Sequence, residues 1–381
     1  MRIALLTYST RPRGGVVHTL NLAEALARAG AEVTVWTLGR GGDSAFFRPV
    51  DPSVHVEVVP FEAHASETVG KRIIRSIETL RAAFRRDHYD TVHAQDCISA
   101  NAVGGCIRTI HHLDQFTTPE LAACHDRAIT EPHARICVSA AVAEEVRARW
   151  GFEPTVIPNG VEYERFAAAA GTGVSQSAQR AAWRERFGPY VLAVGGIEPR
   201  KGSLDLLEAF AVYTRDAPEQ QLVIAGGDTL FDYREYRTAF DVRASELGIA
   251  PVVLGTVEHT ELPALVAAAS VLPFLSTKEG FGLAAMEALA AGTPVVARDL
   301  PVLREVFTDA VEFASTPETM AAAMAAAVTP DTGRRARGQL LAAEFSWDAA
   351  ASAHLKFYAS ATSDTTAWKR RAGSIAASRV G

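Results

Sequence analysis

Residues 272–298, LPFLSTKEGFGLAAMEALAAGTPVVAR, contain a complete strand–loop–helix–strand unit. Residues 272–275 form a short apolar run typical of a buried strand, and a polar loop with two glycines follows at 276–282. Residues 283–291 are helix formers that end at a Gly-Thr-Pro turn, and 295–297 is a second apolar run. This order predicts the βαβ unit of a parallel sheet.

The loop before this helix is suited to binding phosphate. Gly280 and Gly282 flank Phe281, so the backbone can approach a ligand closely there. The free amides of the first helical turn, from Phe281 to Leu283, point toward whatever lies in front of the helix. A helix start of this kind favours a phosphate group.

Two carboxylates frame the same loop, Glu279 before the glycines and Glu287 inside the helix. A carboxylate beside a diphosphate would repel it, unless the carboxylate reaches past the phosphate to hydroxyl groups. Because a carboxylate accepts two hydrogen bonds side by side, it suits the vicinal diol of a ribose or a sugar. The combination predicts a sugar nucleotide. The alternative is that Glu279 complements the helix dipole and Glu287 is a solvated helix residue.

A dinucleotide site is a second alternative for this stretch. Gly280, Gly282 and Ala285 match G-x-G-x-x-A, and Asp299 follows the next strand, as in an NAD-dependent oxidoreductase. In that interpretation the motif would come late in the chain, and Glu279 would have no role.

Glu279 and Glu287, with seven residues between them and followed by A-x-x-x-G-T-P-V-V-A, resemble the E-x7-E motif of retaining glycosyltransferases of family 4 (glycosyl transferases group 1). The resemblance implies an α/β GT-B fold, with two Rossmann-like doubly wound domains facing across a cleft and a C-terminal helix crossing back. It also implies transfer of a hexose from a nucleotide diphosphate sugar to a hydroxyl acceptor, without a metal or another cofactor. A GT-B sugar-nucleotide-binding protein or epimerase without transferase activity is the alternative.

The whole chain is consistent with a two-domain enzyme. Its 381 residues are enough for two ordinary domains, and the net charge of −6 argues against nucleic-acid binding. Neither a signal peptide nor a membrane-spanning run is evident, so we expect a cytoplasmic protein. The cysteines have no zinc-site spacing and are expected to be buried, reduced thiols: Cys97, Cys106, Cys124 and Cys137.

The first strand and helix of the chain carry a glycine pair between them. A strand is expected at 3–8 and a helix at 16–29, with Gly14 and Gly15 in the intervening turn and His18 one turn into the helix. The glycines offer exposed amides at a helix start. The resemblance implies that they lie beside the donor phosphates and the acceptor, whereas the alternative is a glycine turn without a ligand.

The sequence predicts a basic amphipathic helix at residues 71–88, KRIIRSIETLRAAFRRDH. We expect it to be a surface helix packed on a sheet. Peripheral contact with an anionic membrane through the same residues is the alternative, because a glycan, a small molecule or a lipid could supply the acceptor hydroxyl.

Histidines follow two of the predicted strands in the first half. His93 comes at the end of one strand, and His111 and His112 at the end of another. Ligands bind at the carboxyl ends of parallel strands. The resemblance matches the segment Thr109 to His111 to a T-x-H motif whose His contacts the donor sugar, and it places Asn159 in a P-N-G-V segment. His93 could instead be satisfied by neighbouring groups, and Asn159 could be a turn residue.

A change in composition predicts the domain boundary. Residues 167–179 are mostly Ala, Gly, Ser and Thr, which suggests a linker. We therefore expect a first, acceptor-side domain at 1–170, a linker at 171–188, a donor domain at 189–357, and a return of 358–381 to the first domain.

The donor domain opens with a strand and two cations, Arg200 and Lys201. They would neutralise a diphosphate leaving group, although a charged surface turn is the alternative. The family has a further Arg where this chain has Gly196, and we expect Arg200 to replace it. Gly226 and Val257 follow the next two strands, where the resemblance implies nucleotide contacts. It assigns the ribose diol to Glu287, and the sugar hydroxyls to Glu279 and His111.

Overall fold

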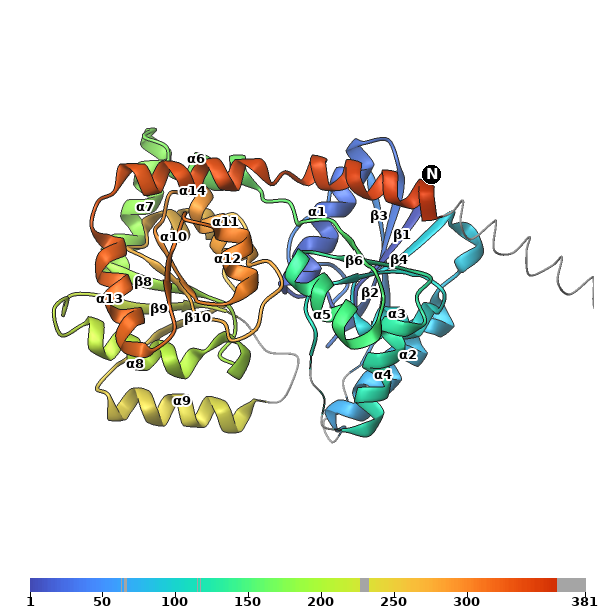
Figure 1. Ribbon diagram of the computed structural model, residues 1–381, viewed down its shortest axis with the longest axis horizontal. Coiled ribbons are helices and arrows are strands. Elements are labelled where there is room, and N and C mark those ends of the chain that lie inside the picture. Colours follow the sequence, from blue (N-terminus) through green and yellow to red (C-terminus); the bar gives the residue numbers. More distant parts are fainter. Residues whose placement is uncertain (63, 65–66, 115, 117, 227–232, 362–381) are drawn as a thin grey trace, which may run out of the picture. The chain divides into compact units, whose positions relative to one another are not determined.

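The computed structural model describes residues 1–62, 64, 67–114, 116, 118–226 and 233–361 (Figure 1). The chain forms two compact units. The first contains Met1–Gly160 and the segment from Trp347 onward, and the second contains Val161–Ser346. Each unit has an α/β architecture with parallel strands, as the sequence predicts.

The first unit is built on a seven-stranded parallel sheet with the order β3-β2-β1-β4-β5-β6-β7. Its interior strand β1 is apolar and buried from Ile3 to Leu6, because helices cover both faces of a parallel sheet. The strands are β1 Arg2–Leu6, β2 Glu32–Arg40, β3 Val54–Phe61, β4 Thr91–Ala94, β5 Ile107–Ile110, β6 Ala134–Cys137 and β7 Thr155–Val156.

Helices connect these strands, and polar caps fix where several of them begin. Asp96 accepts from the Ser99 amide at the start of α3, and Ser139 accepts from the Val142 amide at the start of α5. The helices are α1 Gly14–Arg28, α2 Val69–Ala83, the 3-10 turn η1 Arg86–His88, α3 Cys97–Val103, α4 Pro119–Thr130, α5 Ala140–Trp150 and a last helix at 347–361.

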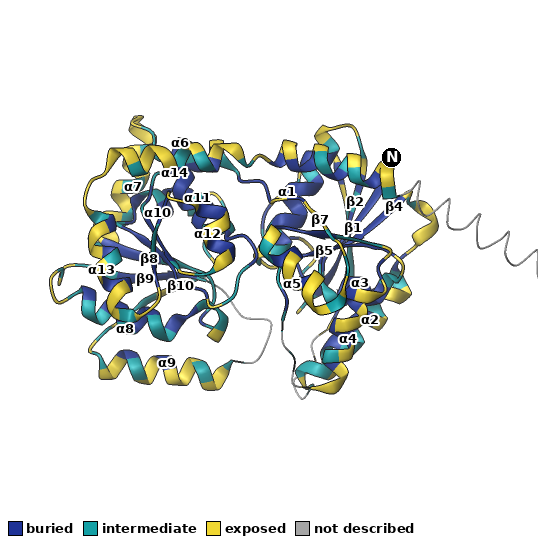
Figure 2. Ribbon diagram, viewed as in Figure 1, coloured by how far each residue is buried: buried dark blue, intermediate teal, exposed yellow. Residues whose placement is uncertain are grey.

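Helix α2 is the basic amphipathic helix, and it packs on its own unit. Its apolar residues Ile73, Ile77 and Leu80 are buried, and its other face is exposed (Figure 2). Arg75 is bonded to Glu67, so this basic group is also engaged within the unit. The helix is therefore a surface helix on a sheet, and the alternative of membrane contact has no support in the fold. No helix in the described part of the chain has the length and apolar character needed to span a bilayer.

The strands of the second unit form two three-stranded parallel sheets, β10-β9-β8 and β11-β12-β13. A parallel bridge between Val191 and Val271 joins them, with the Leu192 amide donating to the Val271 carbonyl at 3.0 Å. The strand order across both is that of a doubly wound fold. The strands are β8 Tyr190–Val194, β9 Gln221–Ala225, β10 Val252–Gly255, β11 Leu272–Phe274, β12 Val295–Arg298 and β13 Glu312–Ala314.

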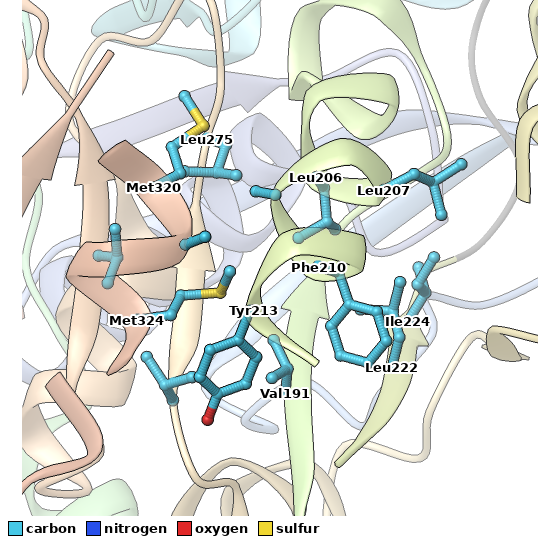
Figure 3. Packing of buried hydrophobic residues seen from close by; sticks show 14 of the residues in the cluster. Val191, Leu206, Leu207, Phe210, Tyr213, Leu222, Ile224, Leu275, Met320 and Met324 are labelled. Carbon is cyan, nitrogen blue, oxygen red and sulfur yellow. The ribbon is translucent and has the colours of Figure 1, made fainter. Parts of the chain in front are cut away.

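The core of the second unit lies between this sheet and helices α8 and α13 (Figure 3). Leu206 and Phe210 of α8 pack with Met320 and Met324 of α13, all buried. The helices of this unit are α6 Tyr163–Ala169, α7 Val174–Phe187, the 3-10 turn η2 Pro199–Lys201, α8 Ser203–Tyr213, α9 Arg234–Glu246, α10 Leu262–Ala268, α11 Leu283–Ala290, α12 Pro301–Phe307, α13 Pro317–Val328 and α14 Thr332–Glu344.

The predicted linker at 171–188 is wrong, because α7 occupies most of it and belongs to the second unit. Alanine is the strongest helix former, so an Ala-rich stretch with little to bury can still be helical. Arg180 secures the turn between α6 and α7 by donating to the carbonyl of Gly171 at 2.9 Å.

The chain passes between units earlier than predicted, after Gly160 rather than 170, and returns at Trp347 rather than 358. Gly160 has to be a glycine, because a Cβ there would lie 2.4 Å from the Trp347 amide nitrogen. The last helix thus belongs to the first unit over its whole described length. The remainder of the predicted return segment, 362–381, lies outside the described residues.

Candidate active site

Two cations and a carboxylate meet in the second unit. Arg200 and Lys201 lie in η2, which follows β8, and Glu279 lies in the loop after β11. The Lys201 Nζ is 2.6 Å from the Glu279 Oε1, and an Arg200 Nη is 3.1 Å from the same oxygen. Only 11% of the Glu279 side chain is exposed, so the pairs are partly shielded from water. The three residues that the sequence singles out here are thus brought together.

Further bonds hold these two loops against each other. Arg200 also donates to Glu198 at 2.8 Å, and its carbonyl accepts from the Thr277 amide at 2.7 Å. The stem of Lys201 lies over Gly195, where a Cβ would be 3.2 Å from the lysine Cε. Gly195 has a φ of +141°, so a side chain there would also strain the backbone. The position of both cations is therefore set by bonds of the backbone and side chains around them.

Helix α11 begins beside this cluster with free amide groups. Its N-cap, Gly282, has a φ of +96°, and a Cβ there would lie 2.7 Å from the Phe307 ring, so only glycine fits. Neither a side-chain cap nor an acidic residue is present in the first turn. Phe281 is buried, with its ring 5.3 Å from that of Phe345, so its side chain is structural and only its backbone is available. Leu283 opens the helix as predicted.

Glu287 lies on α11 and remains partly exposed. Burial, and secondarily the nearby carboxylate of Glu162, raise its pKa to about 8, although Arg165 acts in the opposite direction. Arg165 is itself bonded to Glu162 at 2.9 Å. Within the described residues, no hydrogen-bond donor reaches the Glu287 carboxyl, which is therefore available to the hydroxyls of a ligand. The sequence did not single out Glu162 or Arg165, because charged pairs on a short helix are common.

Gly226 and Val257 lie after β9 and β10, at the carboxyl ends of two neighbouring strands. A Cβ on Gly226 would lie 1.7 Å from the Gly195 carbonyl oxygen, so close packing of two strand ends explains this glycine. Val257 is partly buried. Residues 227–232, which follow Gly226, are outside the described part of the chain.

In the first unit, His111 follows β5 and is surrounded by other groups of the predicted site. Its ring centroid is 4.7 Å from that of His18, in an edge-to-face arrangement, and a Cβ on Gly15 would lie 3.7 Å from its Cδ2. Gly14 has open space around it. Burial lowers the pKa of His111 well below its usual value, and its Nε2 has no hydrogen-bond partner among the residues that the structure describes. This neutral ring can offer a hydrogen bond to a ligand, but it cannot serve as a cation near neutral pH.

His18 and Asn159 form a buried pair, with the His18 Nδ1 2.9 Å from the Asn159 Oδ1. Burial lowers the pKa of His18 to about 3, so the ring is neutral, and Nδ1 donates to the amide oxygen. The Asn159 side chain is thus bonded to a histidine of its own unit, which goes beyond the expected role of a turn residue. The sequence did not show this pair because the two residues are far apart along the chain.

His93 is structural, which corrects its assignment as a possible ligand contact. It is fully buried in β4, and its ring nitrogens are each 2.7 Å from a hydroxyl, Nδ1 from Tyr358 and Nε2 from Thr109. Both polar atoms are therefore satisfied by the protein. His112 is partly exposed and lies 3.2 Å from Asp114.

The described residues contain no group of three or more His, Cys, Asp or Glu side chains that could hold a metal ion. The four cysteines are free thiols. Burial raises the pKa of Cys97 to about 11, which makes it a poor nucleophile, although its Sγ is 3.4 Å from the His125 ring. Asp299, the acid of the dinucleotide alternative, is paired with Arg304 at 2.7 Å.

Comparison with known proteins decides between these alternatives. Residues 12–165 match the family described as Glycosyltransferase Family 4, and residues 176–330 match Glycosyl transferases group 1. The D-inositol 3-phosphate glycosyltransferase of Xylanimonas cellulosilytica is 30% identical, over 95% of this chain and 97% of the relative. The chain is a family 4 glycosyltransferase. The glycogen synthase of Mycobacterium tuberculosis is 29% identical to this enzyme over 95% of each chain.

Solved structures assign the fold of this family 4 enzyme. HepE of Anabaena in complex with UDP-glucose superposes with a TM-score of 0.71, at 19% identity, over 94% of this chain and 100% of HepE. Sucrose-phosphate synthase of Thermosynechococcus elongatus superposes with a TM-score of 0.72, at 22% identity, over 94% of this chain and 98% of the synthase. The fold is therefore the predicted two-domain, Rossmann-like GT-B fold. The interpretation as an NAD-dependent oxidoreductase is wrong.

Proposed function

We propose that this glycosyltransferase moves a hexose from a nucleoside diphosphate sugar to a hydroxyl acceptor, with retention at the anomeric carbon and without a metal ion. The observation that carries the proposal is the convergence of Lys201 and Arg200 on one oxygen of Glu279. Two cations held at one point can neutralise the charge that develops on a departing diphosphate, which is the task a metal performs in other transferases.

Within the second unit, each group has a separate proposed task. Lys201 and Arg200 bind the diphosphate, and the amides at the start of α11 add hydrogen bonds to it. Glu287, when ionised, accepts two hydrogen bonds from the ribose diol, for which its partly exposed carboxyl is suited. Arg200 supplies the second cation, because this chain has Gly196 at the position where the family has an arginine.

The proposed chemistry takes place on one face of the sugar. The bond from the anomeric carbon to the diphosphate oxygen breaks through an oxocarbenium-like state, and the acceptor oxygen bonds to the same face. The acceptor proton passes to the departing phosphate oxygen. This scheme needs positioned positive charge and no pair of catalytic carboxyls. A hydrogen bond between the neutral His111 ring and a substrate hydroxyl fits the His111 Nε2, which has no partner in the described part of the chain.

Relatives suggest which substrates to test first. HepE has been crystallised with UDP-glucose, so UDP-glucose is the first donor to try. Several relatives of about 30% identity bear names that contain inositol 3-phosphate, which makes phosphorylated polyols reasonable first acceptors.

Thermal unfolding of the purified enzyme with a panel of UDP-, GDP- and ADP-sugars tests donor binding, because a ligand that binds only the folded state raises Tm. We expect one nucleotide sugar to raise Tm, with NAD and NADP having no effect. The absence of any shift with the whole panel would contradict the proposed donor class.

The finer steps are tested on the product. With the donor known, proton NMR of the product reports the anomeric configuration, and we expect that of the donor to be kept. Full turnover in EDTA is expected as well. An inverted product would refute the one-face scheme, and activity that EDTA abolishes and a divalent ion restores would refute metal independence.

A further inference from the structure

The ring of His111 lies against the first turns of α1. Gly15 and His18 are three residues apart on this helix, so they share one of its faces. The Cδ2 of His111 is 3.7 Å from the place of a Cβ on Gly15, and its ring centroid is 4.7 Å from that of His18. The face of α1 formed by these two residues thus limits where the His111 ring can lie.

The rings of His18 and His111 meet edge to face, with 76° between their planes. Aromatic rings favour this arrangement over a direct face-to-face stack. Burial lowers the pKa of His18 to about 3 and the pKa of His111 well below its usual value, so both rings are neutral near pH 7. Neutral rings can pack this closely, whereas two imidazolium ions would repel each other.

Three other groups fix the orientation of the fully buried His18 ring. Its Nδ1 donates to the Asn159 Oδ1 at 2.9 Å, which sets its tautomer. The rings of Trp347 and His354, in the last helix, have centroids 5.3 and 6.3 Å from that of His18, both in edge-to-face arrangements. His18 is therefore held by parts of the first unit that are far from α1 along the chain.

The groups that hold His18 are closely packed themselves. Asn159 and Trp347 are both buried. Gly160 follows Asn159, and a Cβ on this glycine would lie 2.4 Å from the Trp347 amide nitrogen. Neither segment can shift toward the other, so the support behind His18 is firm.

His111 has no hydrogen bond of its own to hold its ring. In the part of the chain that the structure describes, no protein group bonds to this ring, and its buried Nε2 is without a partner. A side chain without such bonds can change its rotamer unless its neighbours hold it by contact. Contact with the face of α1 thus supports the His111 ring in place of hydrogen bonds.

We propose that His18 is a positioning residue for His111, and that it holds the His111 ring in the orientation in which this ring bonds a substrate hydroxyl. The proposal rests on the proposed function, in which His111 supplies that hydrogen bond. His18 acts through His111 and not on the substrate, because its ring is buried and its Nδ1 is bonded to Asn159.

The test compares variants of the full-length enzyme. His18→Ala removes the ring and leaves room for His111 to turn, and His18→Phe restores an aromatic ring without the bond to Asn159. His111→Ala removes the group that is positioned. The control is His125→Ala, which removes another buried histidine of the same unit, one whose ring centroid is 6.1 Å from that of Trp150.

NMR of the histidine-labelled enzyme reports the place of the His111 ring without any substrate. The probe is the NOE between the His111 Hδ2 and the Gly15 Hα protons, and His111→Ala assigns it. We expect His18→Ala to weaken or abolish this NOE, and His18→Phe to restore it. The control His125→Ala should keep it, and unchanged His125 signals in the His18 variants show that the unit is folded. An NOE of full strength in His18→Ala would overturn the proposal.

Turnover, measured as release of UDP from UDP-glucose, tests the consequence for the reaction. We expect His111→Ala and His18→Ala each to lower kcat roughly 10- to 100-fold, as for the loss of one hydrogen bond in the transition state. His18→Phe should recover most of this loss, although it melts below the wild type because it lacks the bond to Asn159. Activity then follows the ring, and stability follows the hydrogen bond.

The double variant of His18→Ala and His111→Ala separates positioning from a purely structural role. We expect its kcat to equal that of His111→Ala alone, because His18 has nothing to position once that ring is removed. A loss equal to the product of the two single losses would overturn the proposal. The pair of His125→Ala and His111→Ala should show no such coupling.

The two measurements distinguish this proposal from the proposed function. Loss of the NOE in His18→Ala, together with full turnover in His111→Ala, would uphold the positioning and contradict the role of His111 toward the substrate. An unchanged NOE in His18→Ala, together with reduced turnover in His111→Ala, would do the reverse. No release of UDP by the wild type would contradict UDP-glucose as the donor, and the NOE would still decide the positioning.

Discussion

Replacing Glu287 with glutamine tests the environment of the carboxyl to which we assign the ribose diol. The folded protein holds the pKa of Glu287 at about 8, against an ordinary value of 4.5, mainly because burial disfavours the charged form. Glutamine has nearly the same shape and is neutral at every pH. The difference in stability between the variant and the wild type therefore measures the cost of ionising Glu287.

This cost has a defined dependence on pH. Below 4.5 the carboxyl is neutral in the folded and the unfolded protein, so the two proteins have similar stability. Between 4.5 and about 8 only the unfolded chain releases the proton, and the wild type loses stability relative to Glu287→Gln. Above about 8 both states are ionised and the difference is constant.

The size of the plateau follows from the same shift. A change of one in pKa corresponds to about 1.4 kcal/mol of stability. Glu287 is partly exposed, so water reduces the cost of ionising it, and a difference of about 2 kcal/mol is expected. For a domain of the size of the second unit, Glu287→Gln should then melt roughly 4–8 °C above the wild type at high pH.

Differential scanning fluorimetry of both proteins across a pH series, from about pH 5 to pH 9, measures this difference. The matched control is Glu185→Gln, an exposed glutamate on α7, for which we expect no trend with pH. The donor supplies a second observable, because a diol donates to the ionised carboxylate. Donor affinity should rise with pH in the wild type and stay flat in Glu287→Gln. A difference in Tm that is the same at every pH would refute the reasoning.

Three other substitutions have clear expected outcomes. Lys201→Ala should lower kcat by about 10²- to 10³-fold with little change in Tm, and full turnover would remove its role toward the leaving group. Gly282→Ala should destabilise the second unit by about 2–4 kcal/mol in chemical denaturation, because its φ is +96° and a Cβ would lie 2.7 Å from Phe307; an unchanged midpoint would contradict this account. Tyr358→Phe should lower Tm by removing the partner of the His93 Nδ1, at a cost of about 1–3 kcal/mol, whereas equal stability would mean that water replaces the hydroxyl.

The local order of elements could be predicted from the sequence. The strand, loop, helix and strand of residues 272–298 occur as β11, α11 and β12 with ends within a residue or two. Each has a strong local cause, in apolar runs of strand length and a glycine that stops or starts a helix. The linker prediction failed for the opposite reason, since nothing local in an Ala-rich segment distinguishes a helix from a flexible connection, and the packing of α7 decides it.

Long-range partners could not be predicted. His93 followed a strand as a ligand-binding residue would, and its partner Tyr358 is 265 positions away. Spacing along the chain identifies single groups, whereas the tertiary fold decides which polar atoms are already satisfied.

Glu279 posed a problem on sequence alone, because a carboxylate beside a diphosphate should repel it. In the structure this carboxylate pairs with both Lys201 and Arg200, and Glu198 pairs with Arg200 as well, so two carboxylates face the two cations. In the proposed function, a donor diphosphate competes with Glu279 for these cations, and a displaced carboxylate can accept hydrogen bonds from sugar hydroxyls. The same residue can thus stabilise the empty site and orient the sugar in the filled one, and its negative charge does not have to face the phosphate in either state.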